Sequence, residues 1–586
     1  MRQLEYLLIL RDYFSLVEKD KDIPISINEL AEILHSSDRN TLNILKKFKQ
    51  SNRIKWVPGR GRGNKSMLCF SSTFQELAQE YIYEMVQEEN VTEIINFIHT
   101  PYLSEFAQKT LYSHLQANLG PKIENTITEE KNVVKILLSQ EIKTLDPMNA
   151  LLYSEAHLIT HLYNTLVTFK DGELRPSLAY AWKQQDNGRK WVFHLRKSVF
   201  FHNGEMLSAR DVKYTIERIV SNPQSPVSPL LEDINKVEIV GSHKICFYLK
   251  EQNYFFPRIL SSFHCSILNY SFQHDNSING TGPFMLQERK EHFIRLKAFQ
   301  TYFQERPLID RLDTWMLKNA NRLPNQISSL QLLSHQQPTV THNQELSGSR
   351  FLLFNLMKKG FHDNLYFRKC IQQLLSPELL VNELKGNRFL PAASFLPSIS
   401  KRMVNHSNDI SIASTYLHKS TYNGEELKLY YFELNEGYES AEWIQKQGRK
   451  IGLNISLFPI NYAAQNSEDV LKNADLLLLS VILDTDVELG LYTIYKSNTS
   501  FIRQFFSHET INLVDHFLHA FVRRNEKETR IEQLIEIEKM LKAKDIIHFL
   551  YHAVNKLNYH PALKNISFQS YGLPNFQSLW IDSDEI

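Results

Sequence analysis

The stretch from Ile25 to Phe70, ISINELAEILHSSDRNTLNILKKFKQSNRIKWVPGRGRGNKSMLCF, decides how the N-terminal part of this chain folds. Ser26 followed by Glu29 forms a capping-box pattern, which predicts the start of a first helix. A short polar turn comes next, and Ser37 can cap a second helix at its N-terminus. Two helices joined by so short a turn are typical of a helix-turn-helix unit.

The second helix of this unit is expected to have one buried and one polar face. Leu42, Leu45 and Phe48 recur at helical spacing and predict its buried stripe. The outward face carries the following side chains: Arg39, Asn40, Asn43, Lys46 and Lys47. Asparagine can pair bidentately with adenine, whereas cations more often fix a protein on DNA through phosphates.

A basic two-stranded wing is predicted directly after the second helix. Residues 54–57 and 66–70 have the composition of strands, and the glycine-rich tip between them carries Arg60, Arg62 and Lys65. The chain holds nine Lys and Arg and no Asp or Glu from position 39 to 65. This layout predicts double-stranded DNA as a partner, contacted by Arg39, Asn40, Asn43, Lys46, Lys47, Arg60, Arg62 and Lys65. The plainer interpretation is a surface hairpin beside a solvated helix.

Length and charge show how the rest of the chain is organised. A chain of 586 residues is too long for one domain and is expected to form about three structural units. Residues 1–70 hold 13 Lys and Arg and 8 Asp and Glu, whereas the remainder holds 53 and 57. The positive charge is therefore concentrated in the helix-turn-helix region, which favours a local nucleic-acid contact. We find no signal peptide or membrane-spanning stretch, and we expect a cytoplasmic protein without a membrane partner.

The residue patterns indicate neither catalysis nor a bound cofactor. Cys69, Cys246, Cys265 and Cys370 form no CxxC pair, so reduced structural thiols are the expected state. The sequence contains no nucleophile elbow, phosphate loop or HExxH motif, and its 22 histidines are scattered. We therefore expect no catalytic residue, no cofactor and no metal site.

Residues 133–586 have an α/β texture, and ordered motifs give them a family resemblance. These motifs are Leu145-Asp146-Pro147, the segment WKQQDNGRKWVFHLRKSVFFHNGEMLSARDV at 182–212, Gly280-Thr281-Gly282-Pro283-Phe284, and the stretch 302–310. Together they make this region similar to the family 5 extracellular solute-binding proteins of oligopeptide and dipeptide importers. The resemblance implies two α/β lobes around a cleft that closes on its ligand.

The same resemblance implies one candidate ligand-binding residue. Asp484, in Leu483-Asp484-Thr485-Asp486, falls where peptide-binding members hold the ligand's amino terminus with an aspartate. Where the family has Gly-Trp before this aspartate, the present chain has Ser480-Val481. A solvated carboxylate after a strand is the alternative interpretation of Asp484.

Taken together, the two halves resemble the SgrR-type transcriptional regulators. The expected fold is multidomain: an α-rich winged helix-turn-helix followed by a two-lobed α/β domain of the periplasmic-binding-protein type. We expect five segments: the winged helix-turn-helix with its following helices at 1–121, a linker at 122–132, a first lobe at 133–345, a second lobe at 346–545, and a return to the first lobe at 546–586.

The resemblance implies a ligand-responsive, DNA-binding transcriptional regulator. Its solute-binding domain would sense a small molecule (a peptide, sugar or sugar phosphate) and alter the DNA affinity of the winged helix. The alternative is a cytoplasmic or transporter-associated solute-binding protein without specific DNA binding. Apolar helices between residues 74 and 119 allow a homodimer but do not require one.

Overall fold

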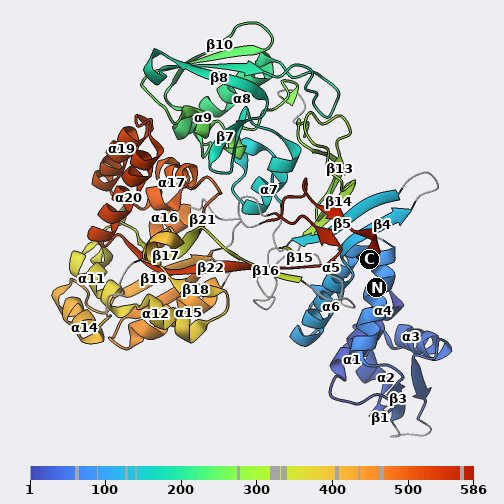
Figure 1. The fold of residues 1–586 in the computed structure, drawn as a ribbon. Coiled ribbons are helices and arrows are strands. Elements are labelled where there is room, and N and C mark those ends of the chain that lie inside the picture. The colour runs from blue at the N-terminus through green and yellow to red at the C-terminus, as the bar shows by residue number, and fades with distance from the viewer. Residues whose placement is uncertain are drawn as a thin grey trace.

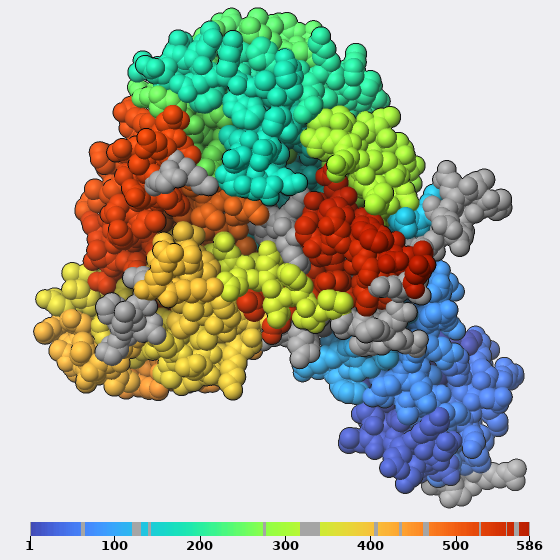
Figure 2. Space-filling model, in the orientation of Figure 1, coloured from blue at the N-terminus to red at the C-terminus, as the bar shows by residue number. Residues whose placement is uncertain are grey.

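The computed structural model describes residues 2–59, 65–88, 90–125, 130–138, 142–272, 277–316, 330–331, 340–402, 408–432, 436–460, 468–567 and 573–585. Figure 1 shows the N-terminal domain attached to one side of a larger α/β part. Figure 2 shows that this domain projects from the rest of the molecule. On the face shown, the part of the domain that projects is open to a partner.

The predicted helix-turn-helix and wing are confirmed. The elements in order are α1 (Gln3–Tyr13), β1 (Asp22–Ile25), α2 (Ile27–Ile33), α3 (Asp38–Gln50), β2 (Ile54–Val57) and β3 (Ser66–Phe70). The Ser26 N–H donates to Glu29 Oε2 over 2.7 Å, and the Glu29 N–H donates to Ser26 Oγ over 3.2 Å, which closes the capping box. Ser37 caps α3 as expected. The strand β1 was not predicted; it pairs with β3 and completes a sheet in the order β1-β3-β2.

Three further helices complete the N-terminal domain. They are α4 (Phe74–Gln87), α5 (Val91–Ile98) and α6 (Glu105–Ala117). Their apolar side chains are mostly buried, including Tyr81, Ile94, Leu111 and Leu115. These residues form one continuous apolar cluster with α1, α3 and the wing strands. They are therefore core residues of this domain.

The segment expected to be a linker at 122–132 contains parts of two paired strands. β4 (Gly120–Asn125) pairs antiparallel with β5 (Glu130–Leu138). β5 in turn pairs with β14 (Arg311–Met316), which makes it part of the next sheet. Backbone hydrogen bonds hold this hairpin, and a polar sequence does not reveal such pairing. The N-terminal domain is thus joined to the α/β part through β5, which pairs with both β4 and β14.

The sheet that receives this strand has six strands, and we call it the six-stranded sheet. Its main path is β12 (Phe284–Lys290), β13 (Phe293–Ala298), β14, β5 and β15 (Leu330–Gln331), with β4 beside β5. Along β5, Ile136 and Leu138 face one core and Leu137 faces another, as strand alternation requires. One face packs on α7 (Tyr153–Leu162) and the C-terminal residues; the other contacts the N-terminal domain.

A four-stranded sheet forms a second unit of the α/β part. Its order is β10 (Ile234–Ile239), β11 (Lys244–Leu249), β9 (Lys190–Leu195) and β8 (Ala179–Gln185). α8 (Ala209–Val220) packs on it, and the hairpin β6 (Val167–Lys170) and β7 (Glu173–Pro176) precedes it. The short helices η1 (Pro147–Asn149), η2 (Asp186–Gly188), η3 (Ser228–Leu231), α9 (Phe256–Ile259) and η4 (Phe263–Cys265) lie in the connections.

The third unit is a seven-stranded mixed sheet. Its path is β16 (Val340–Glu345), β22 (Ile547–Tyr559), β17 (Gly348–Phe354), β21 (Leu476–Ile482), β19 (Glu426–Phe432) and β20 (Asn454–Ile460), with β18 (Arg388–Pro391) paired to β22. β19, α15 (Gly437–Arg449) and β20 form a strand-helix-strand unit in which the two strands are parallel.

Helices surround the seven-stranded sheet, and the chain then returns to the first one. The helices are η6 (Phe361–Asp363), α11 (Leu365–Leu374), α12 (Pro377–Leu384), α13 (Pro397–Ser400), α14 (Ile410–Lys419), α16 (Glu468–Asn473), α17 (Val487–Lys496), α18 (Phe501–Gln504), α19 (His508–Val522) and α20 (Lys527–Ala543). β22 still pairs in the seven-stranded sheet, so the return takes place along this strand rather than at 546. The end of the chain forms β23 (Leu563–Lys564), β24 (Trp580–Ile581) and η9 (Ser583–Glu585).

The Gly-Thr-Gly-Pro motif packs directly on the end of α7. A Cβ atom on Gly280 would lie 2.0 Å from the carbonyl oxygen of Leu162, and one on Gly282 would lie 2.4 Å from that of His161. His202 connects the motif to the segment 182–212, because its N–H donates to Gly280 O over 2.9 Å. Only glycine fits these two positions, so the motif is a packing feature.

A buried histidine holds the C-terminal residues on α7. His161 Nδ1 donates to His157 O over 2.8 Å, and His161 Nε2 accepts from the Phe576 N–H over 3.1 Å. Nε2 can accept this hydrogen bond only in the neutral ring, and burial lowers the pKa of His161 to about 4.

We expect stability to fall when the solution is acidified. The unfolded chain protonates His161 near its ordinary pKa of 6.5, whereas the folded chain does so only near 4. The unfolded state therefore binds more protons between pH 6.5 and 4, and the free energy of unfolding decreases across that window. Urea denaturation at pH 7 and pH 4.5 measures this loss. The His161→Gln variant should lose less stability on acidification than the wild type, and equal losses would contradict the assignment.

Candidate nucleic-acid interface and ligand cleft

The recognition face of α3 is polar and open to solvent. Thr41, Ile44, Leu45 and Phe48 form its buried stripe. The predicted DNA-contacting residues on the opposite side are all exposed: Arg39, Asn40, Asn43, Lys46 and Lys47. Their exposure agrees with the predicted contact, and their role remains a prediction.

The prediction that Leu42 is buried is wrong. Its side chain is 50% exposed. Thr41 occupies the stripe position instead, and Leu42 lies about 100° further round the helix. Leu45 and Phe48 lie three and six residues after Leu42, and four and seven residues after Thr41. Both sets of spacings fit one helix face, so the spacing could not decide between the two positions, and the more apolar side chain was chosen.

Two of the predicted DNA contacts are held by other groups of the protein. Asn40 Nδ2 donates to Ser36 Oγ over 2.7 Å, so its amide is engaged in the turn before α3. Lys65 Nζ lies 2.8 Å from Glu29 Oε1, and this contact, with the hydrogen bonds from Ser26, lowers the pKa of Glu29 to about 2. Among the described residues, Asn43 makes no such side-chain hydrogen bond, which leaves it the better candidate for a base contact.

The tip of the wing lies partly outside the described residues. Arg60 and Arg62 belong to this part, and their role remains a prediction. The base of the wing is well defined, since Lys49 Nζ donates to Trp56 O over 3.2 Å and thereby connects α3 to β2. α3 and the wing are thus fixed relative to each other.

The predicted ligand aspartate and its neighbour have different environments. Asp484 follows β21, is half-buried and accepts a hydrogen bond from Thr485 Oγ1 over 2.9 Å. Its role in ligand binding remains a prediction. Asp486, two residues later, is fully buried and caps α17 by accepting from the Leu489 N–H over 3.0 Å.

A buried ionic cluster connects the four-stranded sheet to the helices of the seven-stranded sheet. Arg258 Nε in α9 donates to Asp486 Oδ2 over 2.8 Å, and its Nη1 lies 3.0 Å from Glu488 Oε2. Arg530 of α20 also pairs with Glu488, at 3.2 Å. The Arg258 guanidinium lies 4.4 Å from the centre of the Phe169 ring. We call these four charged residues the buried ionic cluster.

Other contacts join the seven-stranded unit to the four-stranded unit and to α7. The Tyr254 N–H donates to Val522 O over 2.8 Å, and the ring of Phe255 lies 4.6 Å from that of Phe521. Tyr153 of α7 accepts from the Ile482 N–H over 3.1 Å at the end of β21. Figure 2 shows the four-stranded unit and the C-terminal helices meeting as one continuous surface. The structure therefore has these units packed directly together.

Sequence reasoning missed the buried ionic cluster. The two Arg258 contacts join residues 228 and 230 positions apart, and no local spacing marks such a pair. The one available signal was the second aspartate of Leu483-Asp484-Thr485-Asp486, which stands directly before an apolar helix and suits an N-cap.

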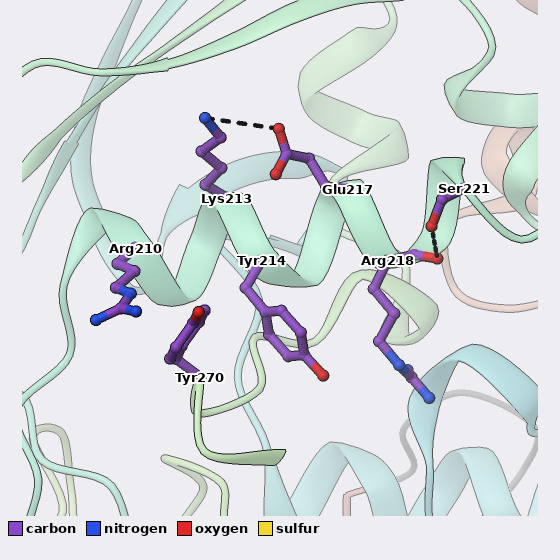
Figure 3. Close-up of a pocket in the computed structure, with 7 residues that line it drawn as sticks. All are labelled: Arg210, Lys213, Tyr214, Glu217, Arg218, Ser221 and Tyr270. Carbon is purple, nitrogen blue, oxygen red and sulfur yellow. Dashed lines mark hydrogen bonds and ion pairs between the residues drawn. The ribbon is translucent and has the colours of Figure 1, made fainter. Parts of the chain in front are cut away.

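A surface groove of about 590 Å³ runs along α8 (Figure 3). Arg218 pairs with Asp146, and Lys213 pairs with Glu217. The Arg210 guanidinium lies 3.6 Å from the centre of the Tyr270 ring. Among the described residues, none that lines the groove belongs to the seven-stranded unit; the lining residues are Arg210, Lys213, Tyr214, Glu217, Arg218, Ser221 and Tyr270. We therefore do not identify it with the ligand cleft.

The cysteines are buried thiols, as expected. Cys69, Cys246, Cys265 and Cys370 are unpaired and buried. Burial raises the pKa of the Cys265 and Cys370 thiols to about 12, which disfavours the reactive thiolate. The described part of the chain contains no helix with the length and apolar character needed to cross a bilayer. The same residues bring together no group of three or more metal-binding side chains.

Two family models match the chain. The model of the bacterial extracellular solute-binding proteins, family 5 (middle part), matches residues 173–501, which is just over half of the chain. The model of the N-terminal part of the sugar transport-related sRNA regulators matches residues 6–120. The first covers the four-stranded and most of the seven-stranded unit, and the second covers the winged-helix domain.

Similar proteins share this two-part organisation. The chain is 28% identical over 562 residues to the uncharacterized protein YhjP of Bacillus subtilis, covering 95% of this chain and 96% of that protein. It is 24% identical over 576 residues to the HTH-type transcriptional regulator SgrR of Yersinia enterocolitica, covering 96% of each. The similarity therefore extends over both parts of the molecule.

Solved structures of binding proteins share the fold of the α/β part. The periplasmic binding protein DppA of Helicobacter pylori, in complex with the peptide STSA, aligns with a TM-score of 0.66 at 18% identity, covering 77% of this chain and 98% of that one. A dipeptide-binding protein from Pseudoalteromonas, in complex with Met-Leu, gives the same TM-score at 17% identity, covering 76% and 100%. The predicted fold class is confirmed. The chain belongs to family 5 of the bacterial extracellular solute-binding proteins, and its N-terminal domain matches the N-terminal model of the sugar transport-related sRNA regulators.

Proposed function

We propose that this chain is a DNA-binding transcriptional regulator whose α/β part senses a peptide or another small molecule. The observation that carries the proposal is the winged-helix domain. The exposed face of its helix α3 is cationic, and its apolar core includes residues of the six-stranded sheet. A cytoplasmic location is part of the proposal, because such a regulator must reach DNA. Relatives named as transcriptional regulators support it.

DNA binding is proposed to use α3 and the wing. Arg39, Lys46 and Lys47 are exposed cations that can neutralise phosphates, with Arg60 and Arg62 as further candidates on the wing. Asn43 is the candidate for reading a base edge. Asn40 and Lys65 are weaker candidates in this proposal, because intramolecular contacts already hold them.

The route from ligand to DNA is proposed to pass through the six-stranded sheet. Leu137, Phe293 and Trp315 of this sheet are buried in the same apolar cluster as the N-terminal helices. The winged helix therefore moves with the six-stranded sheet, and cleft closure moves the seven-stranded unit relative to both. A ligand can change DNA affinity only by its different affinity for the open and closed states.

Fluorescence anisotropy on DNA from upstream of the protein's own gene tests the proposal. The intact chain should bind this DNA in the presence of scrambled competitor DNA. Ligand sensing is tested by repeating the titration with peptides, sugars and sugar phosphates that raise the melting temperature of the protein. Binding of a ligand without any binding to genomic DNA fragments would favour a solute carrier instead.

Removing two α3 cations should flatten the salt dependence of DNA binding. Replacing Lys46 and Lys47 by alanine is expected to reduce the slope of log K against log salt by about 2, since each phosphate contact contributes about 0.9. Affinity should fall for all DNA sequences alike. The double variant Lys446→Ala, Lys472→Ala, which removes the same charge from exposed sites outside the N-terminal domain, serves as control. Equal slopes for both double variants would exclude Lys46 and Lys47 from the phosphate contacts.

A further inference from the structure

One apolar side chain stands on the exposed face of α3. Leu42 is 50% exposed, and its helical neighbours Arg39, Asn43 and Lys46 are exposed polar residues. Positions three and four residues apart lie side by side on a helix, so Leu42 is adjacent to Arg39 and Lys46. Figure 1 shows α3 at the outer side of the N-terminal domain. The proposed DNA-binding face is therefore not uniformly polar.

Leu42 lies on the flank of α3 that faces the wing. Lys49 follows it by seven residues, which is almost two full turns, so the two side chains share one flank. Lys49 Nζ reaches Trp56 O in β2, which fixes the direction of this flank. Val57, the last residue of β2, is 62% exposed. A duplex held between α3 and the wing would meet Leu42.

The chemistry of base edges limits what Leu42 can contact. In the major groove the four base pairs present hydrogen-bond donors and acceptors, and thymine alone adds a methyl group. An apolar side chain on a helix in that groove gains free energy by covering this methyl group and gains nothing from a polar edge. We propose that Leu42 is a specificity-determining residue that contacts a thymine methyl group, a proposal that rests on DNA binding by α3.

The experiment removes only the methyl group. The preferred duplex is first selected from a randomised DNA pool with the intact protein, and each thymine is then replaced singly by deoxyuridine. The wild type should lose about three- to tenfold in affinity at one position, as expected for burying one methyl group. The Leu42→Ala variant should bind the thymine and deoxyuridine duplexes at that position equally. Alanine has the highest helix propensity, so α3 should remain folded.

A matched control separates this role from a general effect of lost apolar surface. Leu16 is 99% exposed and lies between α1 and β1, outside α3. The Leu16→Ala variant should retain the full discrimination of the wild type. The assignment would be overturned if Leu42→Ala still bound the thymine duplex more tightly than the deoxyuridine duplex. It would also be overturned if the wild type showed no such difference at any thymine. Either result would leave DNA binding itself intact. Failure of the wild type to select any sequence would overturn the proposed function and this assignment together.

Discussion

Replacing Arg258 by methionine is expected to lower the free energy of unfolding by about 3–5 kcal/mol. The substitution removes the cation that pairs with Asp486 and leaves that carboxylate buried without its partner. Glu488 keeps Arg530, so the loss should come mainly from Asp486. Urea denaturation followed by circular dichroism measures the change.

Two further variants test whether burial is the cause. Arg523 forms an ion pair with Glu251 between the same two units, but both side chains are substantially exposed. Arg523→Met should cost less than about 1 kcal/mol. The double variant Arg258→Met, Asp486→Leu should recover part of the loss, because no unpaired charge then remains buried. A loss for Arg258→Met as small as that for Arg523→Met would show that the ionic cluster does not hold the units together.

Replacing Trp315 by alanine should have an effect of similar size at a different place. Trp315 is buried where the six-stranded sheet meets the N-terminal helices, and its ring centre lies 5.1 Å from that of Phe293. Truncating so large a buried side chain typically costs about 3–5 kcal/mol. Limited proteolysis should then release the N-terminal domain faster than it does from the wild type.

Trp580 provides the comparison for this variant. It lies in β24 and is 39% exposed, so Trp580→Ala removes the same side chain with a smaller loss of packing. If the two variants unfold and are cleaved alike, the sheet does not support the N-terminal domain in the way described. A selective effect of Trp315→Ala would also predict that ligand no longer changes DNA affinity, since the two parts would be uncoupled.

Local signals in the sequence predicted most of the N-terminal domain. The Ser26 and Glu29 pair, the Ser37 cap and the two wing strands are all present where the residues indicated. The strand β1 was missed because it has only four residues and contains Pro24, which usually argues against a strand. Thr41 was missed as a core residue because a threonine at a stripe position carries no apolar signal.

Features that depend on distant residues were beyond local reasoning. In the sequence, Arg258 and Asp486 have the pattern of ordinary surface charges. Only the fold shows that they are buried against each other. The polar composition of residues 122–132 is typical of a linker. Their pairing in the six-stranded sheet depends on backbone hydrogen bonds, which the composition does not indicate. The residues that decide ligand binding fall in the same class, because a cleft is assembled from several strands at once.

The shared apolar cluster has a consequence for protein engineering. A biosensor made by cutting at residues 121–132 and fusing the winged helix to another binding protein would divide β4 from β5 and expose Leu137, Phe293 and Trp315. Exposed apolar patches of this kind promote aggregation, so neither half should remain soluble as a clean module. Chimeras that transplant the winged helix together with the six-stranded sheet should instead fold, and recombination between such genes should succeed at boundaries within the α/β part.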